Sequence, residues 1–392
     1  MRSKPLLFVL LLAACGGGST GSSAHLPHDP FLDFKLDASG AWQAKPLRDA
    51  LDQVSNNGLG YTGEIDRFEL VVPADGRLVV SLTWDGDSDL DFILASDPQA
   101  ENRLLESSGI DFDAEYESLP VIAGQTIYVI VAGWRGEPGE YLLESTVYPA
   151  GAPEFALETM PDFDALIPNN LPLVFTFNVD LDPDQDLAGR VALLDGGVPV
   201  DGAWCIDGRE LRFHPRLPQF PGDAGGLPAG EQVQLAFHRA ARGVRAVTGE
   251  YLIDATTVSF PAGPPRLEDP AAIPRVLNAP SQGGPLVGAL AFTLSMPINP
   301  LTLFPVLTEE RADGSSRRIA FSFVLSQVEP CHGNPRVQLS LELEEALTPG
   351  TTLRVVLPGN ATALGAPAGA PGLAGPAPTP AGDGFTSTYA ID

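Results

Sequence analysis

Short runs of alternating apolar and polar residues, separated by Gly, Pro or Asp, fill most of this chain. One example is IDRFELVV at 65–72, which the turn PADG separates from RLVVSLTW at 77–84. Because successive side chains of a strand point to opposite faces, each run gives a strand with one buried face. The 41 Gly and 38 Pro among 392 residues suit many short strands joined by turns. We therefore predict an all-β chain of tandem β-sandwich domains.

The predicted strands fall into three groups, which we assign to domains at residues 31–150, 161–262 and 271–392. The last two groups share a plan, since LVFTFNVDLDP at 173–183 parallels LAFTLSMPINP at 290–300. We infer an internal repeat of about 120 residues. Within the third domain, the Pro/Ala/Gly-rich stretch at 365–382 is expected to be a mobile loop. Within the first, residues 46–51 are expected to form a short helical turn.

The first domain resembles the bacterial pre-peptidase C-terminal domain. The motifs that carry the resemblance are IDRFELVVPADGRLVVSLTWDGDSDLDFIL and, later, LPVIAGQTIYVIVAGWRGEPGEYLLE, within residues 60–148. The resemblance implies a jelly-roll-like β-sandwich. That family usually lies beside secreted peptidases, and some members bind calcium or extracellular polymers. No peptidase accompanies the domain in this chain.

The second domain resembles the bacterial Ig-like domain of S-layer proteins. The shared pattern is a strand ending in FTFNVDLDPD, a strand LRFHP, and the segment LPAGEQVQLAF. The resemblance implies an Ig-like sandwich, and the repeat extends this expectation to the third domain.

The first fifteen residues, MRSKPLLFVLLLAAC, predict export and lipidation. Arg2 and Lys4 precede an apolar run that is too short to span a bilayer. The run ends in LAAC, which resembles the bacterial lipobox and predicts cleavage of residues 1–14 and lipid on Cys15. A Gly/Ser-rich segment follows, so residues 15–30 are expected to be a lipidated tether. We expect the protein to be anchored by lipid in the cell envelope, at the outer membrane or the cell surface.

The net charge excludes one class of partner. With 23 basic and 50 acidic residues, the chain has a formal charge of −27. Such a surface repels nucleic acid and favours cations and basic partners. The expected partners are therefore the membrane, reached through the lipid, and an extracellular polymer or an envelope protein.

An acidic turn in the first domain is the candidate metal site. The sequence WDGDSDLD places four carboxylates at alternate positions. Calcium binds six to eight oxygens and could use several of them. The pattern is not an EF-hand, because Leu90 stands where a loop starting at Asp85 needs glycine. The other interpretation is a solvated acidic turn. The candidate calcium ligands are Asp85, Asp87, Asp89 and Asp91.

The first domain has two tryptophans after residue 60, and we expect different roles for them. Trp84 ends a predicted strand, which indicates core packing. Trp134 lies where a strand meets the loop Arg135-Gly136-Glu137. Trp134 is therefore a candidate ligand-binding aromatic residue, with core packing as the alternative.

The two cysteines after the tether, Cys205 and Cys331, occupy equivalent positions in the repeat. Equivalent points of head-to-tail domains lie about a domain length apart, well beyond the ~7 Å Cα limit for a disulfide. Although export favours pairing, we predict that these two residues are not bonded to each other.

The sequence contains no recognisable catalytic motif, such as His-Glu-x-x-His or Gly-x-Ser-x-Gly, and no phosphate-binding loop. We therefore predict that the chain is not an enzyme. The expected function is a binding or structural role in the cell envelope, with adhesion or spacing as its form. The alternative, which rests on where the first domain's family occurs, is an accessory subunit of a secreted peptidase or another extracellular hydrolase.

Overall fold

A computed structural model gives the fold of this chain. It describes residues 34–37, 40–56, 60–107, 114–137, 139–228, 232–238, 242–252, 256–281, 290–328, 331 and 336–392. The predicted signal peptide, Cys15 and most of the tether lie outside these residues. No helix in the described part of the chain is long and apolar enough to cross a membrane. The secondary structure is strand throughout, which confirms the predicted all-β class.

The chain forms two compact units. Unit 1 contains Met1–Ala156 together with Phe237–Ala255, and unit 2 contains Leu157–Ala236 together with Thr256–Asp392. The predicted second domain was continuous over 161–262. In the structure, the segment between its last two strands belongs to unit 1 instead.

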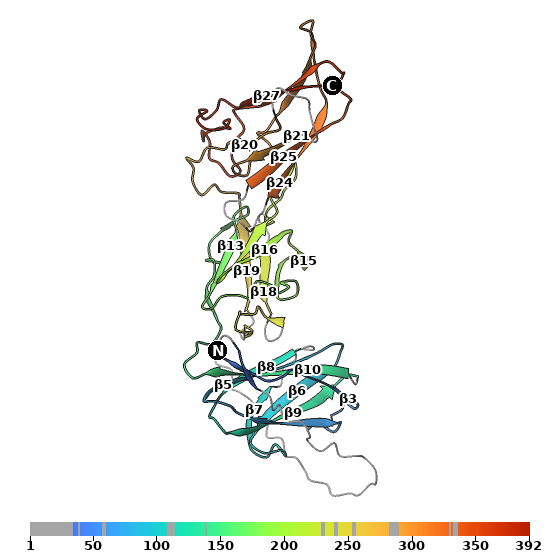
Figure 1. Cartoon of the computed structure of the whole chain (residues 1–392), viewed down its shortest axis with the longest axis vertical. Helices are drawn as coiled ribbons and strands as arrows, with labels where there is room; N and C mark the ends of the chain where they lie inside the picture. The colour runs from blue at the N-terminus through green and yellow to red at the C-terminus, as the bar shows by residue number, and fades with distance from the viewer. Residues whose placement is uncertain are drawn as a thin grey trace. The chain divides into compact units, whose positions relative to one another are not determined.

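Unit 1 is a sandwich of two antiparallel sheets, which form the two layers around β5 and β6 in Figure 1. In the larger sheet the order is β1-β2-β10-β5-β8, and β3 also pairs with β10. In the smaller sheet the order is β4-β9-β6-β7. The strands are β1 (Lys35–Leu36), β2 (Trp42–Gln43), β3 (Leu47–Leu51), β4 (Ile65–Val71), β5 (Gly76–Trp84), β6 (Asp89–Ala95), β7 (Arg103–Ser107), β8 (Ala114–Val121), β9 (Thr126–Arg135) and β10 (Gly139–Pro149).

The core of unit 1 follows from the alternation that the sequence shows. On β5, Leu78, Val80 and Leu82 point inward and are fully buried. On β6, Leu90, Phe92 and Leu94 face them from the other sheet within the same hydrophobic cluster. The intervening residues of both strands therefore face outward, and they include the candidate site residues.

Unit 2 begins with a second sandwich. Its sheets have the orders β11-β13-β17-β16 and β12-β19-β18-β14-β15. Buried phenylalanines fill its core, among them Phe175, Phe213 and Phe260. The strands are β11 (Leu157–Thr159), β12 (Ile167–Pro168), β13 (Leu173–Phe177), β14 (Val191–Asp195), β15 (Val198–Pro199), β16 (Gly202–Asp207), β17 (Glu210–Pro215), β18 (Gln232–Phe237) and β19 (Thr256–Gly263).

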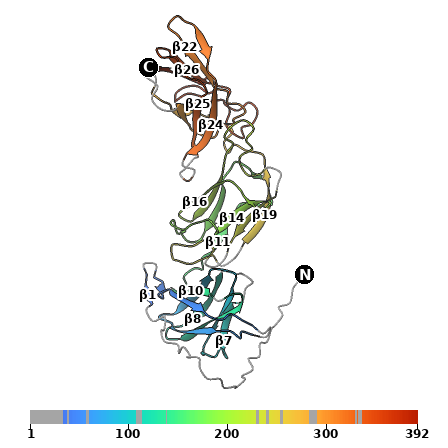
Figure 2. The ribbon, with the colours of Figure 1, turned by 90° about the vertical axis from the view of Figure 1, so that its right-hand side faces the viewer.

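A third sandwich completes unit 2, with the sheets β20-β21-β25-β24 and β23-β22-β26-β27 (Figure 2). Its core includes Phe292, Leu339 and Tyr389. The antiparallel pairing of β21 with β25 repeats that of β13 with β17, as the internal repeat predicts. The strands are β20 (Val276–Asn278), β21 (Leu290–Leu294), β22 (Val306–Glu310), β23 (Ser316–Arg318), β24 (Phe321–Val328), β25 (Arg336–Leu343), β26 (Thr352–Leu357) and β27 (Phe385–Ala390).

Two local predictions differ from the structure. Residues 47–51 form strand β3 and no helical turn, because they complete the sheet beside β10. The Pro/Ala/Gly-rich stretch is anchored within the third sandwich, where Leu373 and Ala374 are fully buried. The Arg275 guanidinium donates to the Thr379 carbonyl across 2.8 Å. These contacts hold the stretch against the third sandwich, which argues against the mobile loop that its composition predicts.

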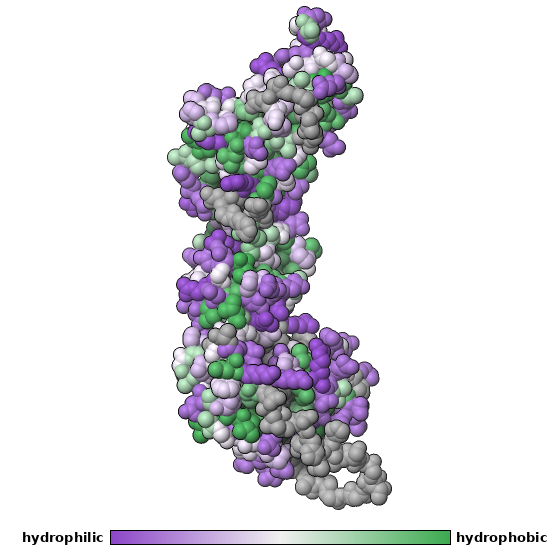
Figure 3. All heavy atoms as spheres, viewed as in Figure 1, coloured by the Kyte–Doolittle hydropathy of each residue, from purple (hydrophilic) through white to green (hydrophobic). Residues whose placement is uncertain are grey.

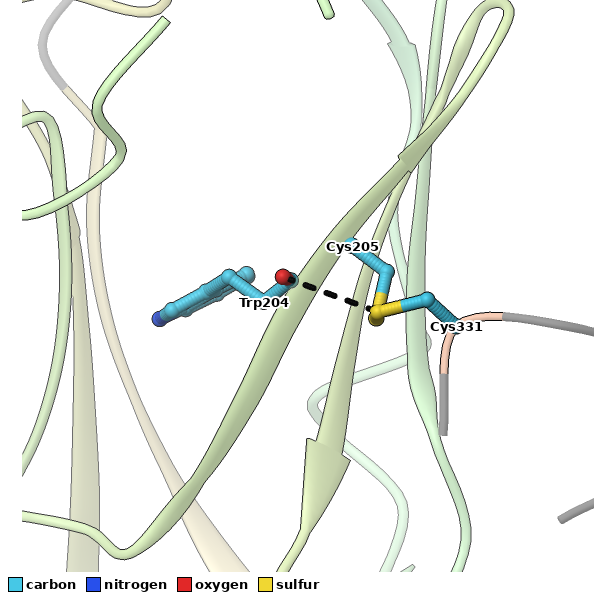
Figure 4. The surroundings of a disulfide bond; sticks show 3 residues. All are labelled: Trp204, Cys205 and Cys331. Atoms are coloured by element: carbon cyan, nitrogen blue, oxygen red, sulfur yellow. Dashed lines mark hydrogen bonds between the residues drawn. A yellow bond between two sulfur atoms is a disulfide. The ribbon is translucent and has the colours of Figure 1, made fainter. Parts of the chain in front are cut away.

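The prediction that Cys205 and Cys331 are not bonded to each other is wrong. They form a disulfide with a Cα–Cα distance of 5.2 Å (Figure 4). Cys205 lies in β16, at the edge of its sheet, whereas Cys331 lies in the connection from β24 to β25. The Sγ of Cys331 is 4.0 Å from the Trp204 carbonyl oxygen. The repeat-equivalent positions therefore lie in different structural elements, which is why the distance argument fails.

Large exposed apolar side chains occur in all three sandwiches, and examples are Ile122, Val198 and Phe304. In the face that Figure 3 shows, hydrophilic and hydrophobic residues are mixed. Single exposed apolar residues are ordinary on folded proteins.

Candidate functional site

The four candidate aspartates divide into two pairs. Asp85 and Asp87 lie in the turn between β5 and β6, where both side chains are exposed. Asp89 and Asp91 lie within β6, on its outward face, yet they are only 5% and 4% exposed. The turn thus corresponds to the solvated interpretation, whereas the strand carries two buried carboxylates.

Asp89 is paired with an arginine from the neighbouring strand. Its Oδ2 is 3.3 Å from Nε of Arg135 on β9. Its Oδ1 is buried and has no hydrogen-bond partner among the described residues. Burial raises the pKa of Asp89, and the positive charge of Arg135 opposes that rise.

Asp91 accepts a hydrogen bond from the Tyr61 hydroxyl at 2.8 Å. Burial raises the pKa of Asp91 to about 7, and the hydrogen bond from Tyr61 works in the opposite direction. The nearby carboxylates of Asp89, Glu115 and Glu106 raise it further. A buried acid that titrates near neutrality is unusual and marks this face of β6 as a candidate site.

Trp134 lies beside the same tyrosine. The two rings meet edge to face, with centroids 5.6 Å apart and an interplanar angle of 83°. The Trp134 carbonyl accepts a hydrogen bond from the side-chain amide of Asn56. Trp134 is half-buried, so its ring helps to fix the segment that carries Asn56 and Tyr61. The structure therefore brings Asp91 and Trp134 together at Tyr61, with Asp89 two residues away on the same face of β6.

The turn that follows Trp134 requires a glycine. Gly136 has a φ of +106°, which L side chains rarely adopt. A Cβ on Gly136 would lie 2.5 Å from the Cα of Ser88. Close packing of Gly136 against Ser88 keeps Arg135, the last residue of β9, next to Asp89.

Trp84 is the other tryptophan considered from the sequence. It is buried and donates from Nε1 to the Ser88 carbonyl at 2.7 Å, as expected for a core residue.

The four aspartates do not converge on one point in this arrangement. Among the described residues, no group of three or more His, Cys, Asp or Glu side chains is placed to hold a metal ion. Asp89 and Asp91 each have a protein partner, and Asp85 and Asp87 face solvent. Among the described residues, the unsatisfied Oδ1 of Asp89 is a feature that favours a cation. Calcium binding therefore stays a prediction, and no step of a mechanism is assigned to it.

Comparison with known proteins gives similarity of fold alone. No protein-family model matches this chain, and no curated protein matches it. Among solved structures, the pre-peptidase C-terminal domain of a collagenase from Bacillus anthracis matches with 12% identity and a TM-score of 0.21, over 26% of this chain and 87% of that one.

Two other solved structures are also similar. Native α2-macroglobulin from Escherichia coli, spanning domains MG0-NIE-MG1, matches with 16% identity and a TM-score of 0.29, over 61% of this chain and 72% of that one. Dimeric latent PorU from Porphyromonas gingivalis matches with 10% identity and a TM-score of 0.20, over 81% of this chain and 30% of that one. At these scores the likenesses carry no functional argument, and the all-β assignment rests on the strands themselves.

A second candidate site, which the sequence did not reveal, lies on the outward face of the larger sheet of unit 1. A pocket of about 160 Å³ opens there, between that sheet and the segment at 242–252. Its lining includes Ser81, Tyr116, Glu144 and Arg245. Arg245 comes from a segment far away in the sequence, so alternation within β5 or β10 gives no signal of this pocket. The unusual feature in the sequence is the length of the β18–β19 connection.

Proposed function

We propose that this chain is an exported, lipid-anchored protein of the cell envelope, with a binding and spacing role and no catalytic activity. The observation that carries the proposal is the disulfide between Cys205 and Cys331. Disulfides persist in oxidising compartments, so the bond supports export, as does the predicted lipobox at Cys15.

The disulfide also supports the spacing role. It links the second sandwich to the third within unit 2, and the backbone amide of Leu325 in the third donates to the Gln219 carbonyl in the second at 2.9 Å. A covalent bond and a backbone hydrogen bond between two sandwiches restrict their relative motion. A restrained pair of domains suits a spacing role, because the two sandwiches then keep a fixed length between their ends.

The test is the location of the protein and of its Cys15→Ser variant. In a detergent-phase partition of whole cells, the wild-type chain should enter the detergent phase, and Cys15→Ser should move to the aqueous phase. Cys331→Ser is the matched control, because it also removes one cysteine but leaves the lipid site. If Cys15→Ser still partitions with detergent, or if the wild-type chain does not, the anchored function is wrong.

The non-catalytic part of the proposal has its own test. The purified chain carrying Cys15→Ser should show no turnover on peptide, ester, glycoside and phosphate substrates. Turnover that survives repurification, and that a point variant of the chain abolishes, would contradict it.

A further inference from the structure

The outward face of the larger sheet in unit 1 carries a row of three side chains across three strands. Ser81 on β5 is paired with Tyr116 on β8 and with Glu144 on β10. Directly paired residues project from the same face of a sheet, about 5 Å from each other. The row therefore presents a phenol, a hydroxyl and a carboxylate side by side.

A hairpin from the β18–β19 connection covers this row. Arg245 and Tyr251 form an antiparallel bridge, and the amide of Ala246 donates to the Glu250 carbonyl at 2.8 Å. The hairpin turns at Gly249, where φ is +85°. Because Tyr251 lies edge to face against Tyr116, with centroids 6.3 Å apart, the hairpin is fixed above the row.

A buried ion pair holds the hairpin in place. Nη2 of Arg77 on β5 is 2.6 Å from Oε1 of Glu250, whose side chain is only 3% exposed. The same guanidinium lies 5.1 Å from the ring centre of Tyr148, a cation–π contact. The Tyr148 hydroxyl donates to the Thr248 carbonyl at 3.4 Å. The hairpin is therefore held firmly on the sheet of unit 1, and it forms one wall of the pocket beneath it.

The pocket wall contains buried polar groups without a hydrogen-bond partner among the described residues, and Ser81 is one of them. Ser81 is 4% exposed, and its Oγ has no hydrogen-bond partner among the described residues. Buried hydroxyls are nearly always hydrogen-bonded, and an unmade bond costs on the order of 1–3 kcal/mol. Since Ser81 lines the pocket, a molecule inside it can supply the missing bond.

The charged side chains that line the pocket restrict the charge of the ligand. Burial raises the pKa of Glu144, and the positive charges of Arg245 and Arg48 oppose the rise. One acidic and one basic side chain line the pocket, so an anion meets Glu144 and a cation meets Arg245. A neutral ligand with several hydroxyls meets neither penalty, because a hydroxyl donates to Glu144 and accepts from Arg245.

The volume of the pocket and its aromatic lining restrict the kind of ligand further. A volume of about 160 Å³ is below the ~300–1,000 Å³ of pockets for drug-sized ligands. Tyr116, Tyr148 and Tyr251 add ring surface to the polar groups. Aromatic rings beside hydroxyl and amide groups suit a small ring with both C–H and O–H groups.

We propose that this pocket binds a single neutral sugar ring, either free or at the end of a glycan, through Ser81, Glu144 and Arg245. The assignment deepens the proposed binding role of the chain. The localisation experiment does not depend on it, so either proposal can fail without the other.

The test is calorimetric titration of the full chain carrying Cys15→Ser with glucose, galactose, mannose and N-acetylglucosamine, each at millimolar concentration. At least one sugar should bind. Ser81→Val should weaken that binding by about tenfold or more while the melting temperature is unchanged or raised, because the lost hydroxyl has no protein partner. Glu144→Gln should weaken it as well. The matched control is Glu140→Gln, on the exposed part of the same face of β10, which should bind as wild type does.

Maltotriose and chitotriose distinguish the two sources of the ligand. If they bind with the same sensitivity to Ser81→Val, the pocket takes glycan ends, and if only the single sugars bind, it takes free sugar. The proposal is overturned if none of the sugars binds, or if binding is indifferent to both Ser81→Val and Glu144→Gln. Binding of glycine in place of the sugars would also overturn it, because that result assigns the pocket to a zwitterion.

Discussion

Cys205 and Cys331 are bonded to each other although 126 residues separate them in the chain. Each belongs to a different sandwich of unit 2, so the bond joins two domains whose cores are separate. By the chain-entropy model, a loop of this length corresponds to a stabilisation of up to about 5 kcal/mol. Since each sandwich has its own core, the disulfide also stabilises the contact between the two sandwiches.

We predict that reduction of this disulfide loosens the contact between the two sandwiches more than it weakens either core. In calorimetry of the chain carrying Cys15→Ser, unit 2 should unfold at a higher temperature in the oxidised protein than in the reduced protein. The transition should broaden or split on reduction, because separate domains then unfold independently.

Thiol counting checks the bond itself. The denatured chain carrying Cys15→Ser should release two thiols after reduction and none before it. Cys205→Ser and Cys331→Ser, tested singly, should reproduce the calorimetric change of the reduced protein. Two free thiols in the unreduced chain would contradict the pairing.

A second prediction concerns Glu309 in the third sandwich. This carboxylate is fully buried and accepts hydrogen bonds from the Thr348 amide at 2.5 Å and from the Thr351 hydroxyl at 3.0 Å. It also pairs with Arg317, which in turn reaches Glu345 at 2.5 Å. The amide of Thr348 is the first of several groups that lower the pKa of Glu309 to about 2.

Because this pKa is lower in the folded state than the ordinary glutamate value of 4.5, the unfolded state binds the proton more tightly. The stabilisation is therefore complete above about pH 4.5 and is lost as pH falls towards 2.

Urea unfolding of the third sandwich at several pH values should show this loss of stability. Glu309→Gln should lower stability at pH 7 and flatten the acid dependence. Glu310→Gln, whose side chain is 42% exposed, should leave both unchanged. An equal acid dependence in Glu309→Gln and wild type would contradict the assignment.

The alternation rule explains which parts of the fold the sequence predicts. On β5 and β6 every second residue is apolar, so the buried faces and the outward positions of Asp89 and Asp91 follow directly. The clustering of these aspartates with Trp134 could also be expected, because β6 and β9 are neighbours. The position of Tyr61, which contacts Asp91 and Trp134, could not be expected, since Tyr61 comes from an irregular segment without periodicity.

Contacts between distant segments explain what the sequence does not predict. The pairing of Cys205 with Cys331 depends on how far the β24–β25 connection reaches, and equivalence in a repeat does not specify that length. The hairpin at 242–252 packs on unit 1 through Arg77 and Tyr148, which lie about a hundred or more residues earlier. Local patterns contain no signal for such pairings.

A third prediction tests calcium at the aspartate turn. If calcium binds only the folded state, its free energy of binding adds about 2.7 kcal/mol at a hundredfold excess over Kd. The melting temperature of unit 1 should then rise by several degrees with millimolar calcium, and Asp87→Ala combined with Asp89→Ala should abolish the rise. Because Arg135 already pairs with Asp89, Arg135→Gln should enlarge it. A melting curve that neither calcium nor a chelator changes would leave Asp85 and Asp87 as a solvated turn.

The last prediction concerns the ion pair between Arg77 and Glu250. Burial raises the pKa of Glu250, and the charge and hydrogen bond of Arg77 oppose that rise. Removing one member of a buried pair leaves the other without compensation, at a cost of about 3–5 kcal/mol. In Glu250→Ala the hairpin at 242–252 should therefore detach before the sheet beneath it unfolds.

Hydrogen exchange measures that detachment directly. In Glu250→Ala, amides such as those of Ala246 and Leu252 should lose protection, while those of β5 and β10 keep theirs. The control is Glu140→Ala, an exposed acid on β10, which should change neither region. Replacing both members, by Arg77→Met with Glu250→Met, should restore part of the protection, because two apolar side chains leave no charge unpaired. Equal exchange in Glu250→Ala and wild type would mean that the buried tyrosine contacts alone hold the hairpin, and that the ion pair adds no net stability to it.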